Sequence, residues 1–105
     1  CAGEQDAFWE YYDYLFSHQN GENQGAFVID NLKSFADELR LDTDQFNECL
    51  DSGRYTALIQ NMTDIGRQLG IQSTPTFAIN GQGVVGAKEF ADFAAIIDPF
   101  LVPEP

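Results

Sequence analysis

Positive charge is scarce in this sequence. Five Lys and Arg residues stand against seventeen Asp and Glu among 105 residues, which gives a formal net charge of -12 at pH 7. Contacts to nucleic-acid phosphates or anionic lipid headgroups need clusters of Lys and Arg, and the sequence has none. It also lacks an apolar run of about 18 residues, the length that a bilayer-spanning helix needs. We therefore expect neither a nucleic-acid partner nor a membrane span.

Cysteine and histidine are also scarce. The sequence has two cysteines, Cys1 and Cys49, and one histidine, His18. These cannot fill the four positions of a tetrahedral metal shell, and the carboxylates are too scattered for a catalytic pair. The glycine-containing run 80–83 lacks the Lys-Ser/Thr ending of a phosphate-binding loop. We therefore expect no metal and no cofactor.

Apolar residues are plentiful enough for a core. They make up 44% of the chain, and 13% of the residues are aromatic, so general disorder is excluded and the length suits one domain. Apolar residues at helical spacing predict helices over residues 4–16, 28–40, 43–51 and 55–69. Asp42 or Thr43 is the predicted N-cap of the third helix, and Gly53 and Gly70 are predicted stops.

The first predicted helix has more aromatic residues than one face can hold. Phe8, Tyr12, Leu15 and Phe16 share a helical face and are predicted to point inward. On this register Tyr11 and Tyr14 point away from the core, which leaves them for a partner surface.

The pattern changes after residue 70. A β-type run over 76–80, a turn over 80–83 and a second strand from Val84 predict a hairpin, and a last helix is predicted over 88–100. The first strand reads as buried on both faces and so needs a neighbour on each edge. Only one neighbour is present. The Thr76–Asn80 edge is therefore either unprotected or paired with another segment or chain.

The residues around Pro75 carry a family resemblance. The run 73–81, Ser-Thr-Pro-Thr-Phe-Ala-Ile-Asn-Gly, resembles the cis-proline loop and following strand of DsbA-like thiol–disulfide oxidoreductases. Residues 5–16 resemble that family's Phe-Trp helix, and residues 41–50 resemble its inserted helices. The implied fold is α/β (α+β) and thioredoxin-like. Residues 1–70 would form the helical insertion and residues 71–105 the C-terminal ββα part, with the N-terminal βα part absent.

The resemblance also implies roles for individual residues. The family's Cys-x-x-Cys pair has no match here, so we expect the redox cysteines outside this chain, no catalytic residue within it, and no activity of this piece alone. Ser73, Thr74 and Pro75 would bind substrate, with a cis bond before Pro75. Cys1 and Cys49 would form a structural disulfide, although the residues alone also allow two free thiols.

The implied partners are cysteine-containing protein substrates and a redox partner of the parent protein, outside the cytoplasm. We also expect a dimer or strand exchange through the Thr76–Asn80 edge. Two alternatives stay open. One is a redox-inactive thioredoxin-like peptide-binding module, tethered as a lipoprotein through Cys1. The other is a relative of kappa-class glutathione transferases on the same fold.

Overall fold

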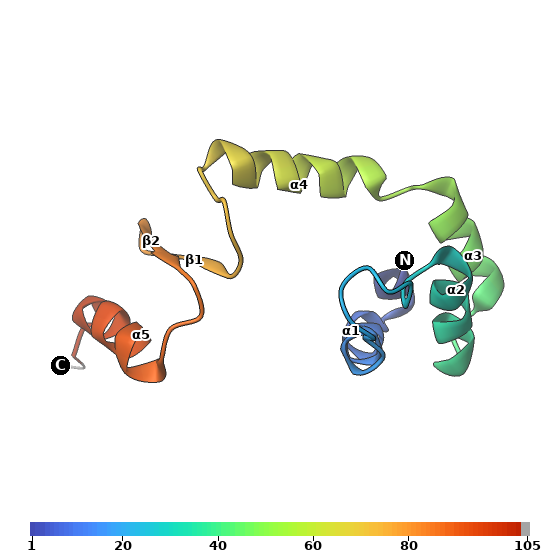
Figure 1. Ribbon diagram of the computed structural model, residues 1–105, viewed down its shortest axis with the longest axis horizontal. Helices are drawn as coiled ribbons and strands as arrows, with labels where there is room; N and C mark the ends of the chain where they lie inside the picture. Colours follow the sequence, from blue (N-terminus) through green and yellow to red (C-terminus); the bar gives the residue numbers. More distant parts are fainter. Residues whose placement is uncertain (104–105) are drawn as a thin grey trace. The chain divides into compact units, whose positions relative to one another are not determined.

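The structure, a computed structural model, describes residues 1–103 of the chain. Its elements are two 3-10 helices, five α-helices and two strands within that range: η1 (Ala2–Gln5), α1 (Phe8–Ser17), α2 (Ile29–Glu38), α3 (Thr43–Ser52), α4 (Thr56–Gln68), β1 (Thr76–Ile79), β2 (Gln82–Val85), α5 (Phe90–Ile97) and η2 (Asp98–Phe100). Figure 1 shows them in chain order. The mixed α/β class is confirmed.

The chain divides into two compact units, Cys1–Ile59 and Gln60–Pro105. The first unit contains helices only, ending with the start of α4, and the second contains the rest of α4, the hairpin, α5 and η2. The predicted division at residues 70 and 71 refers to parts of a thioredoxin fold and stays a prediction.

The core of the first unit forms where η1, α1, α2 and α3 meet. Its buried members are Ala2, Tyr11, Ala36 and Phe46. The rings of Tyr11 and Phe46 lie 5.3 Å apart, and the Tyr11 hydroxyl donates a hydrogen bond to the Leu32 carbonyl at 2.8 Å. The prediction that Tyr11 points outward is therefore wrong. Small Ala36 lets α2 approach α1, so the face containing Tyr11 and Leu15 becomes the packed one.

The opposite side of α1 forms an exposed surface that we call the α1 aromatic surface. Its residues contact each other with ring-centroid distances of 4.8–6.3 Å and are all exposed: Phe8, Trp9, Tyr12 and Phe16. The prediction that Phe8, Tyr12 and Phe16 point inward is therefore wrong. No other element within residues 1–59 covers them. Tyr14, also predicted to point away, instead stacks on His18 and contacts Phe35.

Local residues set the helix ends in this unit. Asp6 has a left-handed φ of 57°, which separates η1 from α1, so the first α-helix begins at Phe8 and not near Glu4. The Asp42 side chain accepts the Gln45 N–H at 3.0 Å and is the N-cap of α3, as predicted. Arg40 adopts a φ of 59°, and α2 ends at Glu38, two residues before its predicted end.

The second unit is built on an antiparallel hairpin. Thr76 pairs with Val85 and Ile79 pairs with Gln82, so the turn contains only Asn80 and Gly81. Both turn residues have positive φ, 47° and 82°, which is the requirement of a type I′ turn and explains the Asn-Gly pair. The turn is therefore two residues shorter than predicted.

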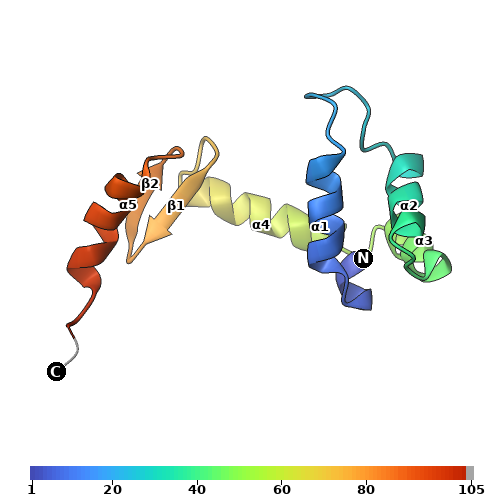
Figure 2. The same ribbon diagram turned by 90° about the horizontal axis from the view of Figure 1, so that it is seen from below.

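Burial in the hairpin is one-sided. Val84 is buried, and Phe77 contacts Phe93 of α5 with ring centroids 5.0 Å apart, so α5 lies along the hairpin (Figure 2). Phe77 and Ala78 are nevertheless exposed, so the prediction that this strand is buried on both faces is wrong. Within residues 1–103 the sheet has only two strands, which leaves one edge of β1 open.

Candidate functional site

The segment Ser73–Thr76, which we call the docking loop, leaves α4 through a defined stop. Gly70 has a φ of 82°, its N–H donates to the Arg67 carbonyl at 3.0 Å, and the Ile71 N–H donates to the Gly66 carbonyl at 3.1 Å. This pair of bonds is the Schellman motif. It fixes the direction in which the chain leaves the helix.

The docking loop is anchored at its other end by the hairpin. The Thr76 hydroxyl donates to the Ser73 carbonyl at 2.6 Å, and the Gly86 N–H donates to the Pro75 carbonyl at 2.8 Å. The peptide bond between Thr74 and Pro75 is cis. The loop is thus held both by the end of α4 and by the end of β2.

The loop presents its central residues to solvent. Ser73, Thr74 and Pro75 are all exposed. Within residues 1–103 the main-chain N–H and C=O of Thr74 make no hydrogen bond. A main-chain donor and acceptor that are exposed and unpaired are what an extended peptide needs in order to pair with a loop.

Two pockets adjoin the docking loop, and both are lined by Ile71, Gln72 and Ser73. The first, of about 490 Å³, is largely apolar and includes Leu69, Phe77 and Val85 in its lining. The second, of about 430 Å³, is lined also by Thr63, Gly66, Arg67 and Thr74, of which Arg67 carries a charge. The loop therefore has two spaces beside it that could take side chains, and one of them includes a charged residue.

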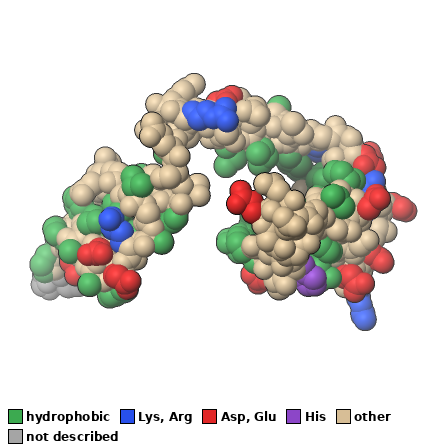
Figure 3. Space-filling view, viewed as in Figure 1, with side chains coloured by type: hydrophobic (Ala, Val, Ile, Leu, Met, Phe, Trp, Pro, Cys, Tyr) green, Lys and Arg blue, Asp and Glu red, His purple; other side chains and the backbone are tan. Residues whose placement is uncertain are grey.

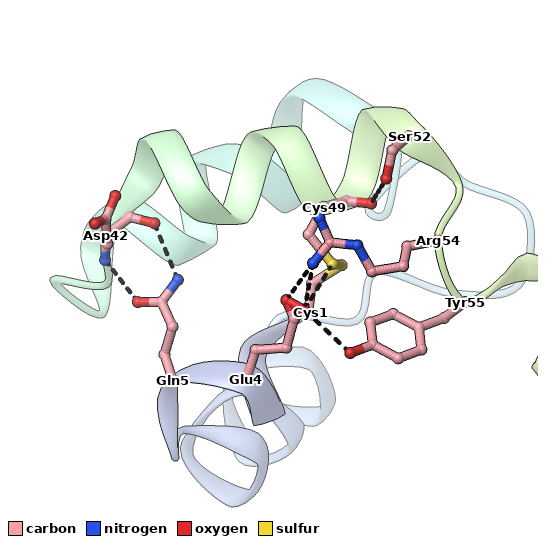
Figure 4. The surroundings of a disulfide bond; sticks show 8 residues. All are labelled: Cys1, Glu4, Gln5, Asp42, Cys49, Ser52, Arg54 and Tyr55. Carbon is pink, nitrogen blue, oxygen red and sulfur yellow. Dashed lines mark hydrogen bonds and ion pairs between the residues drawn. A yellow bond between two sulfur atoms is a disulfide. The ribbon is translucent and has the colours of Figure 1, made fainter.

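The two cysteines are joined in the first unit. Cys1 and Cys49 form a disulfide with a Cα–Cα distance of 5.7 Å, which ties η1 to α3 (Figure 4). Cys49 is 1% exposed and Cys1 is half-buried. The Gln5 side chain adds a second tie between the same elements, since it accepts from the Asp42 N–H at 2.7 Å and donates to the Asp42 carbonyl at 3.0 Å.

A carboxylate lies beside this disulfide. Glu4 Oε2 is 3.8 Å from Cys49 Sγ, accepts a hydrogen bond from the Tyr55 hydroxyl at 3.0 Å, and pairs with Arg54 Nη1 at 2.7 Å. Desolvation raises the pKa of Glu4, but the hydrogen bonds from Tyr55 and Arg54 and the Arg54 charge outweigh it, so the pKa lies below its usual value. The hydrogen bond to Glu4, with desolvation, raises the pKa of Tyr55.

The predicted site residues thus fall into two groups. Ser73, Thr74 and Pro75 come together in the docking loop of the second unit, whereas Cys1 and Cys49 belong to the first. Within residues 1–103 no group of three or more His, Cys, Asp or Glu is placed to hold a metal ion. Sequence reasoning missed Glu4, Arg54 and Arg67. Only the helix stop at Gly70 hinted at Arg67, because residues just before a Schellman glycine lie close to the chain that follows it.

The family model described as thioredoxin matches residues 1–99. The chain is 35% identical over 97 residues to Na(+)/H(+) antiporter NhaA 1 of Salinispora arenicola, covering 92% of this chain and 14% of that protein. It is 38% identical over 82 residues to Na(+)/H(+) antiporter NhaA 3 of Salinispora tropica, covering 78% and 12%. It is 26% identical over 94 residues to disulfide bond formation protein D of Bacillus subtilis, covering 89% and 41%.

The chain therefore spans less than half the length of each of these relatives. No solved structure matches it. Among the described residues, no helix is both long and apolar enough to cross a bilayer.

Proposed function

Because the chain belongs to the thioredoxin family and is a DsbA-like, thioredoxin-fold chain, we propose that it is the peptide-docking part of a protein thiol–disulfide oxidoreductase. The parent protein would exchange a disulfide with cysteine-containing protein substrates, and its redox cysteine pair would lie outside this chain. The observation that carries the proposal is the docking loop, with an exposed and unpaired Thr74 main chain between two pockets.

The docking step follows from the loop geometry. An extended substrate segment would accept a hydrogen bond from the Thr74 N–H and donate one to the Thr74 carbonyl, as in strand addition. Successive side chains of an extended segment point to opposite sides, so neighbouring residues of the substrate would enter different pockets. Ser73 and Pro75 lie on either side of this main-chain contact. Ser73, Thr74 and Pro75 bind the substrate and take no part in the redox step.

The chemistry itself needs a thiolate that the docking loop does not supply. In disulfide exchange a thiolate attacks one sulfur of a disulfide and the other sulfur leaves as a thiolate. Cys49 is a poor candidate for either role, because it is buried and the Glu4 carboxylate lies 3.8 Å from its sulfur. We therefore assign Cys1 and Cys49 a structural role and expect this chain alone to be inactive in disulfide exchange.

The disulfide also bears on location and partners. Structural disulfides persist mainly in oxidising compartments, which supports a place outside the cytoplasm for the parent protein. A redox partner would renew its active pair. The open edge of β1 is a pairing edge for a further strand, from a second copy or another segment, and the oligomeric state in solution tests that part of the proposal.

A peptide with a modified main chain tests docking directly. A fluorescein-labelled octapeptide with serine in place of its central cysteine should bind the chain in an anisotropy titration. Methylating the main-chain nitrogen of the residue that pairs with Thr74 should abolish binding, since that donor is lost. Methylating the main-chain nitrogen of the last residue of the peptide should not. Equal binding of all peptides would show that the loop does not pair with a main chain and would overturn the proposal.

A further inference from the structure

The one charged residue that lines a pocket beside the docking loop is basic, although the chain as a whole is acidic. Acids outnumber bases by seventeen to five in the sequence, and acidic side chains dominate the charged surface visible in Figure 3. Yet within the described residues neither loop pocket is lined by an Asp or Glu. The one charged side chain among the described lining residues is Arg67, which lines the 430 Å³ pocket only.

The position of Arg67 relative to the loop is set by the helix stop. Its carbonyl accepts the Gly70 N–H at 3.0 Å, inside the Schellman motif that also fixes the start of the docking loop. Arg67 is therefore held beside the start of the loop. Together with Ser73 and Thr74 it lines the 430 Å³ pocket.

The guanidinium of Arg67 is available for a ligand. Its side chain is 72% exposed, and its ion pair is with Asp64, at 3.7 Å between Nη1 and Oδ1. The same Asp64 oxygen also accepts a hydrogen bond from the Gln60 side chain at 3.1 Å, so it is shared between Arg67 and Gln60. An exposed ion pair of this kind is weak, and a guanidinium has five N–H donors, so most of them stay open to a second carboxylate.

We propose that Arg67 is a specificity-determining residue that selects substrate segments with an acidic residue next to the docked position. The proposal rests on the proposed peptide docking and adds the substrate class. A carboxylate in the 430 Å³ pocket would take the two parallel N–H donors of the guanidinium, the geometry in which Arg binds carboxylates best. The pocket lined by Leu69, Phe77 and Val85 would take an apolar neighbour.

Three labelled octapeptides test this selection on the 105-residue chain. They share a central serine in place of cysteine and an apolar residue on one side, and carry Glu, Gln or Lys on the other. In an anisotropy titration the Glu peptide should bind about three- to fivefold more tightly than the Gln peptide, and the Lys peptide should bind most weakly. The preference should shrink in 0.5 M salt, because exposed charges are screened.

Two variants, each of which removes one positive charge, distinguish a direct contact of Arg67 from the electrostatic effect of the net charge of the chain. Arg67→Gln should bind the Glu and Gln peptides equally, with unchanged affinity for the Gln peptide. Lys88→Gln removes one cation from the same unit but from neither pocket, and should keep the full preference. The circular dichroism spectra of both variants should match that of the unsubstituted chain, because both side chains are exposed.

The outcomes distinguish the two proposals. Tight binding of all peptides without a Glu preference, or an equal loss of preference in Lys88→Gln, would overturn the role of Arg67 and leave docking intact. A Glu preference that only Arg67→Gln removes would support it. Failure of every peptide to bind would overturn the docking proposal, and the selection with it.

Discussion

The N–H of Ile71 donates to the carbonyl oxygen of Gly66 at 3.1 Å, so the residue after the helix stop is tied back to the last turn of α4. The Ile71 side chain lies close to this turn, since a Cβ added at Gly66 would be 3.9 Å from Ile71 Cδ1. The docking loop therefore inherits its starting direction from the helix, and changes at the stop should reach the loop.

Gly70→Ala should destabilise this stop. The φ of 82° at Gly70 is strained for any residue with a Cβ, although no atom lies within 4 Å of that position. The free energy of unfolding measured in urea should fall by about 1 kcal/mol. Gly66→Ala is the matched control: it lies in the helix with ordinary contacts and should raise the same quantity by up to about 1 kcal/mol. Equal effects would show that the left-handed residue does not fix the helix end.

Removal of the disulfide should weaken the first unit strongly. Cys1 and Cys49 close a loop with a sequence separation of 48, and in the chain-entropy model this constraint on the unfolded state contributes about 4 kcal/mol. The double variant Cys1→Ala, Cys49→Ala should lose that much stability in urea unfolding of this unit. Dithiothreitol should lower the stability of the unsubstituted chain to a similar extent and leave the stability of the double variant unchanged. A reductant effect on the double variant would point to another cause.

Glu4 should make stability depend on acid pH. Its pKa is lowered from 4.5 in the folded chain, so its contribution is present above pH 4.5 and is lost as the pH falls through the folded pKa. Glu4→Gln should be less stable than the parent chain at pH 7, because Arg54 and Tyr55 lose an ionised acceptor. The difference in melting temperature should narrow below pH 4.5. Glu10→Gln, an exposed acid on α1, serves as the comparison, and an identical pH profile for both variants would contradict this role of Glu4.

Tyr11 should make stability depend on alkaline pH. Burial raises its pKa to about 12 from 10.0, so the folded chain is stabilised below pH 10 and loses that stabilisation as the pH rises toward 12. Tyr11→Phe removes the hydrogen bond to Leu32 and should cost about 1 kcal/mol at pH 7. Its stability should also decline less above pH 10. Tyr12→Phe, on the exposed face of α1, should change neither quantity, and a matching loss there would show that burial is not the cause.

Local signals in the sequence determined the ends of the elements better than their packed faces. Asp42 as an N-cap and Gly53 and Gly70 at helix stops depend on a few neighbouring residues, and all three occupy these positions. The turn at Asn80 and Gly81 also follows local chemistry, although the turn predicted over 80–83 is two residues too long. Short-range rules of this kind need no knowledge of the rest of the fold.

The buried face of α1 could not be predicted in the same way. Seven of its ten residues are apolar or aromatic, so two overlapping faces satisfy helical periodicity. The choice of Tyr11 depends on Ala36 and Phe46, which come from other helices. Arg67 illustrates the same limit at the site: its place beside Thr74 results from the turn after α4, and the stop at Gly70 is its only sign in the sequence.

The α1 aromatic surface has a practical consequence for spectroscopy. Trp9 is the single tryptophan of the chain and is 66% exposed, so its emission reports on one spot only. In the uncovered state that emission should be red-shifted and readily quenched by iodide. Any molecule that settles on α1 would shift the spectrum to the blue and shield the indole, which gives this protein an intrinsic optical probe that needs no label.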